Sequence, residues 1–192
     1  MPDHHPRDPD LLPEVTAPNP PADYVELAVT SAFSFLQGAS QPGELALAAH
    51  RHGYDALGIA DLNSLAGVVR LHATAKKLRL RPVIGARIVL ACGTAFLAYP
   101  TDRAAYGRLS ALITKGRRQD LDGAWQGKGR CDLSLDDLAA HARGLRLIWL
   151  PGDDLSPLPD LAARLPELSH VAASWLYRGD DRARARADPQ GE

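Results

Sequence analysis

The fold is decided by residues 24–40, which read Tyr-Val-Glu-Leu-Ala-Val-Thr-Ser-Ala-Phe-Ser-Phe-Leu-Gln-Gly-Ala-Ser. The segment begins with a β-prone run and continues into a polar turn, which predicts a strand followed by a loop. Successive side chains of a strand point to opposite faces, so Glu26, Ala28 and Thr30 share one side. Ligands of α/β proteins gather at the carboxyl ends of the strands. A site is therefore expected where this strand ends.

Strand and helix patterns alternate along the rest of the chain. Strands are expected at 56–60, 82–90, 95–99, 146–150 and 170–173. Helices are expected from Ser40 to about His52, from Asn63 or Ser64, from Thr101 or Asp102, and from Ser134 of a Ser-x-x-Asp capping box. The alternation predicts a mainly parallel α/β architecture. Periodicity alone allows either an open doubly wound sheet or a barrel.

The composition limits the class of protein. With 45% hydrophobic and 23% charged residues and a net charge of −1, the chain is typical of a globular protein. It contains no run of 18 apolar residues and no secretory pattern, and its two cysteines fit a reduced cytoplasm, so a cytoplasmic location without a membrane is expected. Residues 1–22 are rich in proline and predict a disordered leader, residues 23–186 a single domain, and residues 187–192 an irregular tail.

The stretch 24–40 resembles the first motif of the PHP (polymerase and histidinol phosphatase) domain, which begins the alpha subunits of bacterial C-family DNA polymerases. The resemblance is greatest to the error-prone branch. An intact family motif reads His-x-His-Ser-x-Phe-Ser, whereas this chain reads Ala28-Val29-Thr30-Ser31-Ala32-Phe33-Ser34. A methyl group and a weak hydroxyl replace two imidazoles, and neither is a useful ligand for zinc or manganese.

The second and third motifs also lack side chains that would bind a metal in the family. Asp61 keeps the expected carboxylate at the end of the second strand, but Leu62 stands where the family often has histidine. Arg87 stands where a glutamate is expected, and its guanidinium would repel a divalent cation. We therefore expect no catalytic residue and a vestigial metal site, with Asp61 as the one retained candidate ligand. The vestigial site consists of the positions Glu26, Ala28, Thr30, Asp61, Leu62 and Arg87.

Two arrangements of this site remain open. If Arg87 and Asp61 end neighbouring strands at the same edge of the sheet, an arginine–carboxylate pair could fill the place of the metal. Alternatively, Asp61 caps a helix that begins near Ser64, and Arg87 faces solvent.

The resemblance continues through 65–70, 82–86, 101–114 and 176–181, so it spans roughly residues 24–186. It implies a distorted (β/α)7 barrel. The family's later Asp-x-His-x-His strand is missing, so the barrel is expected to be incomplete at its C-terminus. The polymerase palm, whose carboxylates hold magnesium ions, lies far downstream in the family, so this chain is not expected to synthesise DNA alone.

The resemblance implies the PHP portion of an error-prone polymerase of translesion synthesis and damage-induced mutagenesis, with a structural or interaction role. No cofactor is expected for this chain. Magnesium is expected for the full polymerase, and zinc or manganese only if the PHP site is active. Expected partners are the rest of the polymerase, proteins of the mutagenesis complex and, indirectly, DNA. The alternatives are a metal-dependent phosphoesterase or proofreading nuclease, and a stand-alone binding module of the mutagenesis complex.

Overall fold

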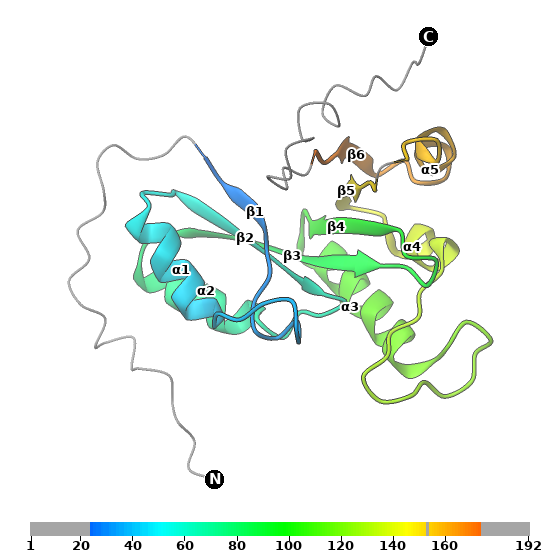
Figure 1. Cartoon of the computed structure of the whole chain (residues 1–192), viewed down its shortest axis with the longest axis horizontal. Helices are drawn as coiled ribbons and strands as arrows, with labels where there is room; N and C mark the ends of the chain where they lie inside the picture. Colours follow the sequence, from blue (N-terminus) through cyan, green and yellow to red (C-terminus); the bar gives the residue numbers. More distant parts are fainter. Residues whose placement is uncertain (1–23, 153, 174–192) are drawn as a thin grey trace. The chain divides into compact units, whose positions relative to one another are not determined.

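The computed structural model describes residues 24–152 and 154–173, which form a mixed α/β fold (Figure 1). The elements follow the order β1 (Glu26–Val29), α1 (Pro42–Arg51), β2 (Ala56–Leu62), α2 (Val68–Lys77), β3 (Arg81–Val89), β4 (Ala95–Pro100), α3 (Arg103–Arg118), α4 (Leu135–His141), β5 (Leu145–Leu150), α5 (Leu158–Arg164) and β6 (Leu168–Val171). The strand order is β1-β2-β3-β4-β5-β6. The chain divides into two compact units, and the division falls within β3, between Gly85 and Ala86.

The first unit joins a parallel strand pair to two helices. Glu26 of β1 lies opposite Leu57 of β2, and Val29 lies opposite Ile59. Figure 1 shows α1 and α2 lying next to each other beside these strands. Apolar side chains from both helices, from β2 and from the segment between α2 and β3 form one buried cluster, made of Ala46, Ala49, Leu57, Ile59, Val68, Leu71, Ala75 and Leu80. This core positions the carboxyl ends of β1 and β2.

Helix α1 confirms the predicted helix, with a shifted start. Its N-cap is Gln41 rather than Ser40, because Pro42 occupies the first helical position and the Gln41 amide donates to Glu44 Oε2 at 2.9 Å. Gly53 follows the helix with φ of 73°, a left-handed conformation that glycine adopts without strain and that ends helices.

The strand pairs of the second unit correct the expected parallel architecture. Strand β3 is antiparallel to β4, β4 is antiparallel to β5, and β5 is parallel to β6. The physical reason is the short connection around Gly93, which has φ of 89° and joins β3 to β4 as a hairpin. A parallel pair would need a crossover of a dozen or more residues.

Both predicted caps of the second unit are confirmed. Asp102 precedes α3, and its Oδ1 accepts a hydrogen bond from the Ala105 amide at 2.7 Å. Ser134 precedes α4 in a capping box with Asp137. Among the described residues, no helix has the length and apolar character needed to cross a membrane.

Candidate functional site

Asp61 is the centre of a buried polar cluster in the first unit. It lies near the carboxyl end of β2 and is 1% exposed. Its carboxylate accepts hydrogen bonds from the Ser31 amide at 2.8 Å, from Ser31 Oγ at 2.8 and 3.0 Å, and from Ser34 Oγ at 2.8 Å. A buried carboxylate is costly unless donors replace its water. Here two serines of the loop after β1 supply those donors.

The same two serines also accept hydrogen bonds from the backbone. Ser34 Oγ accepts from the Leu62 amide at 2.9 Å, and Ser31 Oγ accepts from the Phe33 amide at 3.2 Å. Both hydroxyls are therefore used as donor and acceptor at once, which fixes their orientation. The cluster fastens the β1–α1 loop to the end of β2.

Gly67 allows the start of α2 to approach this cluster closely. A Cβ atom at Gly67 would lie 2.6 Å from Asp61 Oδ2 and 3.0 Å from Ser31 Oγ. The helix begins at Val68, so the predicted start at Asn63 or Ser64 is wrong. Asp61 accepts its hydrogen bonds from the β1–α1 loop, so the alternative in which it caps this helix is wrong too.

The other predicted positions of the first unit do not join Asp61 in a ligand set. The Glu26 carboxylate accepts from the Tyr24 hydroxyl at 2.6 Å and from the Ala28 amide at 2.9 Å. Thr30 Oγ1 donates to the Ala28 carbonyl at 3.4 Å. Glu26 and Thr30 thus bond to residues two positions away in the chain. Leu62 is half-buried and brings no ligand atom.

Arg87 belongs to the second unit, in β3 opposite Leu97 of β4. Its Nε atom is buried and has no hydrogen-bond partner among the described residues. Asp61 belongs to the first unit, so the predicted Arg87–Asp61 pair stays a prediction.

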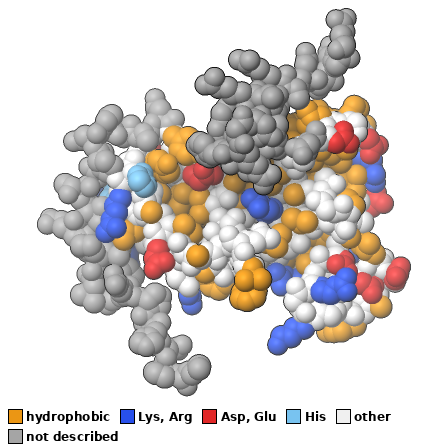
Figure 2. All heavy atoms as spheres, in the orientation of Figure 1, with side chains coloured by type: hydrophobic (Ala, Val, Ile, Leu, Met, Phe, Trp, Pro, Cys, Tyr) orange, Lys and Arg blue, Asp and Glu red, His pale blue; other side chains and the backbone are white. Residues whose placement is uncertain are grey.

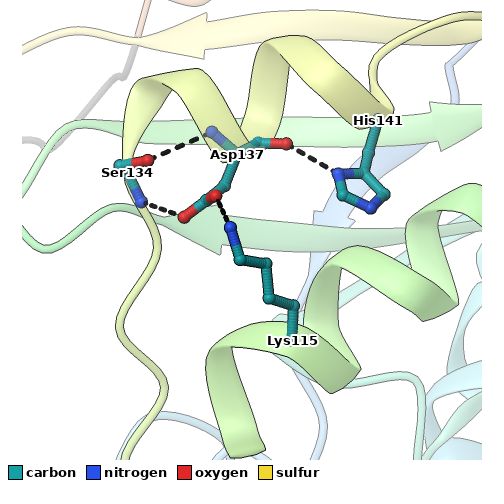
Figure 3. Close-up of polar contacts among 4 residues, drawn as sticks. All are labelled: Lys115, Ser134, Asp137 and His141. Carbon is teal, nitrogen blue, oxygen red and sulfur yellow. Dashed lines mark hydrogen bonds and ion pairs between the residues drawn. The ribbon is translucent and has the colours of Figure 1, made fainter. Parts of the chain in front are cut away.

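The second unit contains a polar cluster of its own, shown in Figure 3. The Asp137 carboxylate forms an ion pair with Lys115 of α3 and accepts from the Ser134 amide at 3.0 Å, while the Asp137 amide donates to Ser134 Oγ at 3.1 Å. His141 Nδ1 lies 2.8 Å from the Asp137 carbonyl oxygen. Burial by itself raises the pKa of Asp137, but the hydrogen bonds from Lys115 and Ser134 and the lysine charge together hold it below its ordinary value.

An open cavity of about 360 Å³ lies beside this ion pair. It is lined by Lys115, Gln119, Asp120, Leu121, Asp122, Gly123, Ser134 and Asp137. The Asp120 carboxylate accepts from the Asp122 and Ala124 amides, at 3.1 and 2.9 Å, and so orders its own turn. The hydrogen bonds between Ser134 and Asp137 cap α4, and the ion pair between Asp137 and Lys115 joins α4 to α3. These contacts have a structural role.

Sequence reasoning treated Ser31 and Ser34 as part of the motif's frame and missed their role. The available signal was a pair of serines three residues apart at the end of a strand that neighbours a buried carboxylate. Ser31 is 30 residues and Ser34 is 27 residues from Asp61 in the chain, so a local sequence pattern cannot predict the contact.

Comparison with known proteins identifies relatives of the chain. A family model described as "PHP domain" matches residues 26–187. An error-prone DNA polymerase of Bradyrhizobium sp. (strain ORS 278) is 44% identical over 176 residues, which are 85% of this chain and 15% of that protein. Error-prone DNA polymerase 1 of Agrobacterium fabrum is 42% identical over 165 residues, which are 84% of this chain and 15% of that protein. The chain thus spans about 15% of the length of these relatives.

Solved structures share the fold at low identity. A putative metal-dependent phosphoesterase from Bifidobacterium adolescentis superposes with a TM-score of 0.57 at 13% identity, covering 80% of this chain and 78% of that one. An amidohydrolase from Chromobacterium violaceum gives 0.53 at 13% identity, covering 77% and 75%. These likenesses confirm the expected α/β class with PHP-type relatives.

The residues at the predicted positions do not fit the divalent metal that the fold family implies. Ala28 and Leu62 lack ligand atoms, and the Asp61 oxygens already accept from Ser31 and Ser34. Within residues 24–152 and 154–173, no three histidine, cysteine or acidic side chains form a group that could hold a metal ion.

Proposed function

Because this chain belongs to the PHP domain family, we propose that it is the PHP portion of an error-prone C-family DNA polymerase and that it acts by packing against the rest of that polymerase. The likeness to error-prone polymerases, at 42–44% identity over about 85% of the chain, supports the lineage. The polymerase as a whole would copy damaged template, with magnesium at a palm outside this chain.

The hydrogen bonding of Asp61 is the observation that carries the non-catalytic part of the proposal. In a metal-dependent hydrolase this carboxylate would have lone pairs directed at the ion. Here the Ser31 amide, the Ser31 hydroxyl and the Ser34 hydroxyl all point at it. These donors, together with the lack of ligand atoms at Ala28 and Leu62, support a site that stabilises the fold instead of activating water.

A reconstitution experiment tests the packing role. The error-prone polymerase of Bradyrhizobium sp. would be produced without the segment that matches this chain and then mixed with the 192-residue protein. We expect the two to co-elute and primer extension to be restored. The relative's own segment, added in the same way, is the positive control. Restoration by that segment together with no binding of this chain would contradict the proposal.

The enzymatic alternative is tested separately. Hydrolysis of bis(p-nitrophenyl) phosphate would be measured with zinc, manganese or magnesium, for the wild-type chain and for a folded Asp61→Asn variant. We expect no rate above that of the buffer. A metal-dependent rate that disappears in Asp61→Asn would favour a phosphoesterase or nuclease. The third possibility, a stand-alone binding module, predicts that partner proteins co-purify with the chain while the truncated polymerase does not.

A further inference from the structure

Helix α2 and the residues after it present an unbalanced positive surface in the first unit. Five basic side chains, all exposed, occur between residues 70 and 81: Arg70, Lys76, Lys77, Arg79 and Arg81. No aspartate or glutamate occurs between residues 62 and 101. Within the described residues, Lys76 and Arg79 form no ion pair. Among the described residues of this unit, the exposed carboxylates are those of Glu44 and Asp55, and neither forms an ion pair with Lys76 or Arg79.

Aromatic side chains stand beside the first turn of α2. Phe35 is 84% exposed, and Phe33 is 39% exposed. The guanidinium carbon of Arg70 lies 5.3 Å from the centroid of the Phe33 ring, and Arg70 Nη1 lies 3.4 Å from Gln41 Oε1. This cation–π contact places the β1–α1 loop next to the positive surface. Figure 2 shows hydrophobic side chains, in orange, at the surface near lysine and arginine side chains, in blue.

The loop that carries the two rings is held in place. Ser31 and Ser34 flank Phe33 in the chain, and both are hydrogen-bonded to the buried Asp61. Leu36, the residue after Phe35, has φ of 62°, a left-handed conformation that is strained for leucine and that the surrounding structure must maintain. An exposed ring on an ordered loop loses little conformational entropy when a ligand stacks on it.

We propose that this surface, formed by Phe33, Phe35, Arg70, Lys76 and Arg79, binds single-stranded DNA. A base stacks on the exposed ring of Phe35, and Arg70, Lys76 and Arg79 contact the phosphates. Arg70 and Lys76 are six residues apart, about 9 Å along the helix and about 120° around it, so they lie on the two borders of its exposed face. Exposed aromatic rings next to a row of cations are the features with which proteins hold single strands irrespective of sequence. The inference rests on the first unit alone and goes beyond the packing role proposed above.

Charge complementarity favours a nucleic acid over a protein at this surface. Cations that no carboxylate balances attract a polyanion and release its counterions. The core of a protein-binding face is usually depleted of charged residues. Here the exposed apolar side chains of the loop, and Val69 of α2 at 75% exposure, lie among exposed cations of the helix and of the residues after it.

The test is fluorescence anisotropy with the 192-residue chain and a short labelled oligothymidylate, which forms no duplex. We expect Phe35→Ala to weaken binding about 5- to 150-fold and Phe35→Trp to preserve it. Lys76→Gln and Arg79→Gln should each reduce the slope of log K against log salt by about 0.7. Trp125→Ala and Lys128→Gln are matched controls, because they remove an exposed ring and an exposed cation from the second unit and should leave binding unchanged.

Three results would overturn the inference: no binding at low salt, equal losses in the control variants, or sedimentation showing that Phe35 instead mediates association of two copies. Phe35→Ala would also be taken through the reconstitution with the truncated polymerase. Normal reconstitution without DNA binding by the wild-type chain leaves the proposed function intact and rejects this surface. Loss of co-elution with the truncated polymerase in Phe35→Ala would assign the surface to protein packing and likewise reject it.

Discussion

The hydroxyl of Ser31 lies 2.8 Å from Oδ2 and 3.0 Å from Oδ1 of Asp61, and the Ser31 amide lies 2.8 Å from the same Oδ1. One residue therefore presents two donors to one buried carboxylate. The contact occurs next to Ala28 and Thr30, where an intact family motif would bring two imidazoles toward a metal. Hydrogen bonds from Ser31 and Ser34, two serines that the intact motif also contains, satisfy the charge of Asp61.

Removing the Asp61 carboxylate should destabilise the chain. Asp61→Ala leaves the buried hydroxyls of Ser31 and Ser34 without their acceptor, and we expect the free energy of unfolding to fall by about 2–3 kcal/mol. Urea unfolding followed by circular dichroism measures this. Asp122→Ala, at an exposed position, should change the value by less than about 0.5 kcal/mol. Equal losses in both variants would mean that the cluster contributes nothing specific.

The close approach at Gly67 makes a methyl group costly there. Gly67→Ala would push a Cβ against Asp61 Oδ2 and the Ile59 side chain, and we expect a loss of about 1–3 kcal/mol. Gly107 provides a matched control within α3, where an added Cβ meets no other atom within 4 Å. Gly107→Ala should raise stability by about 0.5–1 kcal/mol because alanine favours the helix. Thermal melts of the two variants should therefore shift in opposite directions.

The ion pair between Asp137 and Lys115 should make stability depend on acid pH. The pKa of Asp137 is held below its ordinary value of 3.8 in the folded chain, so the ionised carboxylate stabilises the fold above that pH. This contribution should disappear as the pH falls from 3.8 through the folded pKa. Unfolding free energies measured across this range should show the wild-type advantage over Asp137→Asn shrinking toward zero.

Two comparisons complete this test. Asp122→Asn, at an exposed position, should show no such convergence with the wild type. Ser134→Ala removes the other half of the capping box and should cost about 1 kcal/mol. An advantage over Asp137→Asn that persists unchanged below the folded pKa would contradict the assigned cause.

The two free thiols should react at different rates. Cys92 is exposed, and hydrogen bonding to the Thr94 side chain and backbone lowers its pKa, whereas burial raises the pKa of Cys131. Because the thiolate is the nucleophile, iodoacetamide near neutral pH should alkylate Cys92 first. Peptide mass mapping over time checks the order. Thr94→Val should slow Cys92 and leave Cys131 unchanged, and faster labelling of Cys131 would contradict the prediction.

Local signals predicted much of the fold. Gly53, Asp102 and the Ser134 capping box act through neighbours in the chain, and each ends or begins a helix where the sequence indicated. The predicted start of α2 was wrong because a tertiary contact decides where the helix begins. Gly67 packs closely against Asp61, and a local sequence pattern does not indicate this contact.

The candidate site was predictable only in part. Asp61 was identified as the retained carboxylate, and the structure places it in a buried polar cluster. Its partners were not identified, since serine pairs are common in turns and become specific only when β1 pairs with β2. The antiparallel hairpin of β3 and β4 was not predicted, although the few residues between the two strands cannot form a parallel crossover.

The span of the Ser31–Asp61 contact has a consequence for the order of folding. Its thirty-residue separation means that chain closure must precede any gain from these hydrogen bonds. The β1–α1 loop should therefore become ordered only after β2 has docked, and the two should unfold as one cooperative segment. Native-state hydrogen exchange would report this as matching protection of the Ser31 and Ile59 amides. The hydrogen bonds between Ser31, Ser34 and Asp61 would then form last and complete the folding of the first unit.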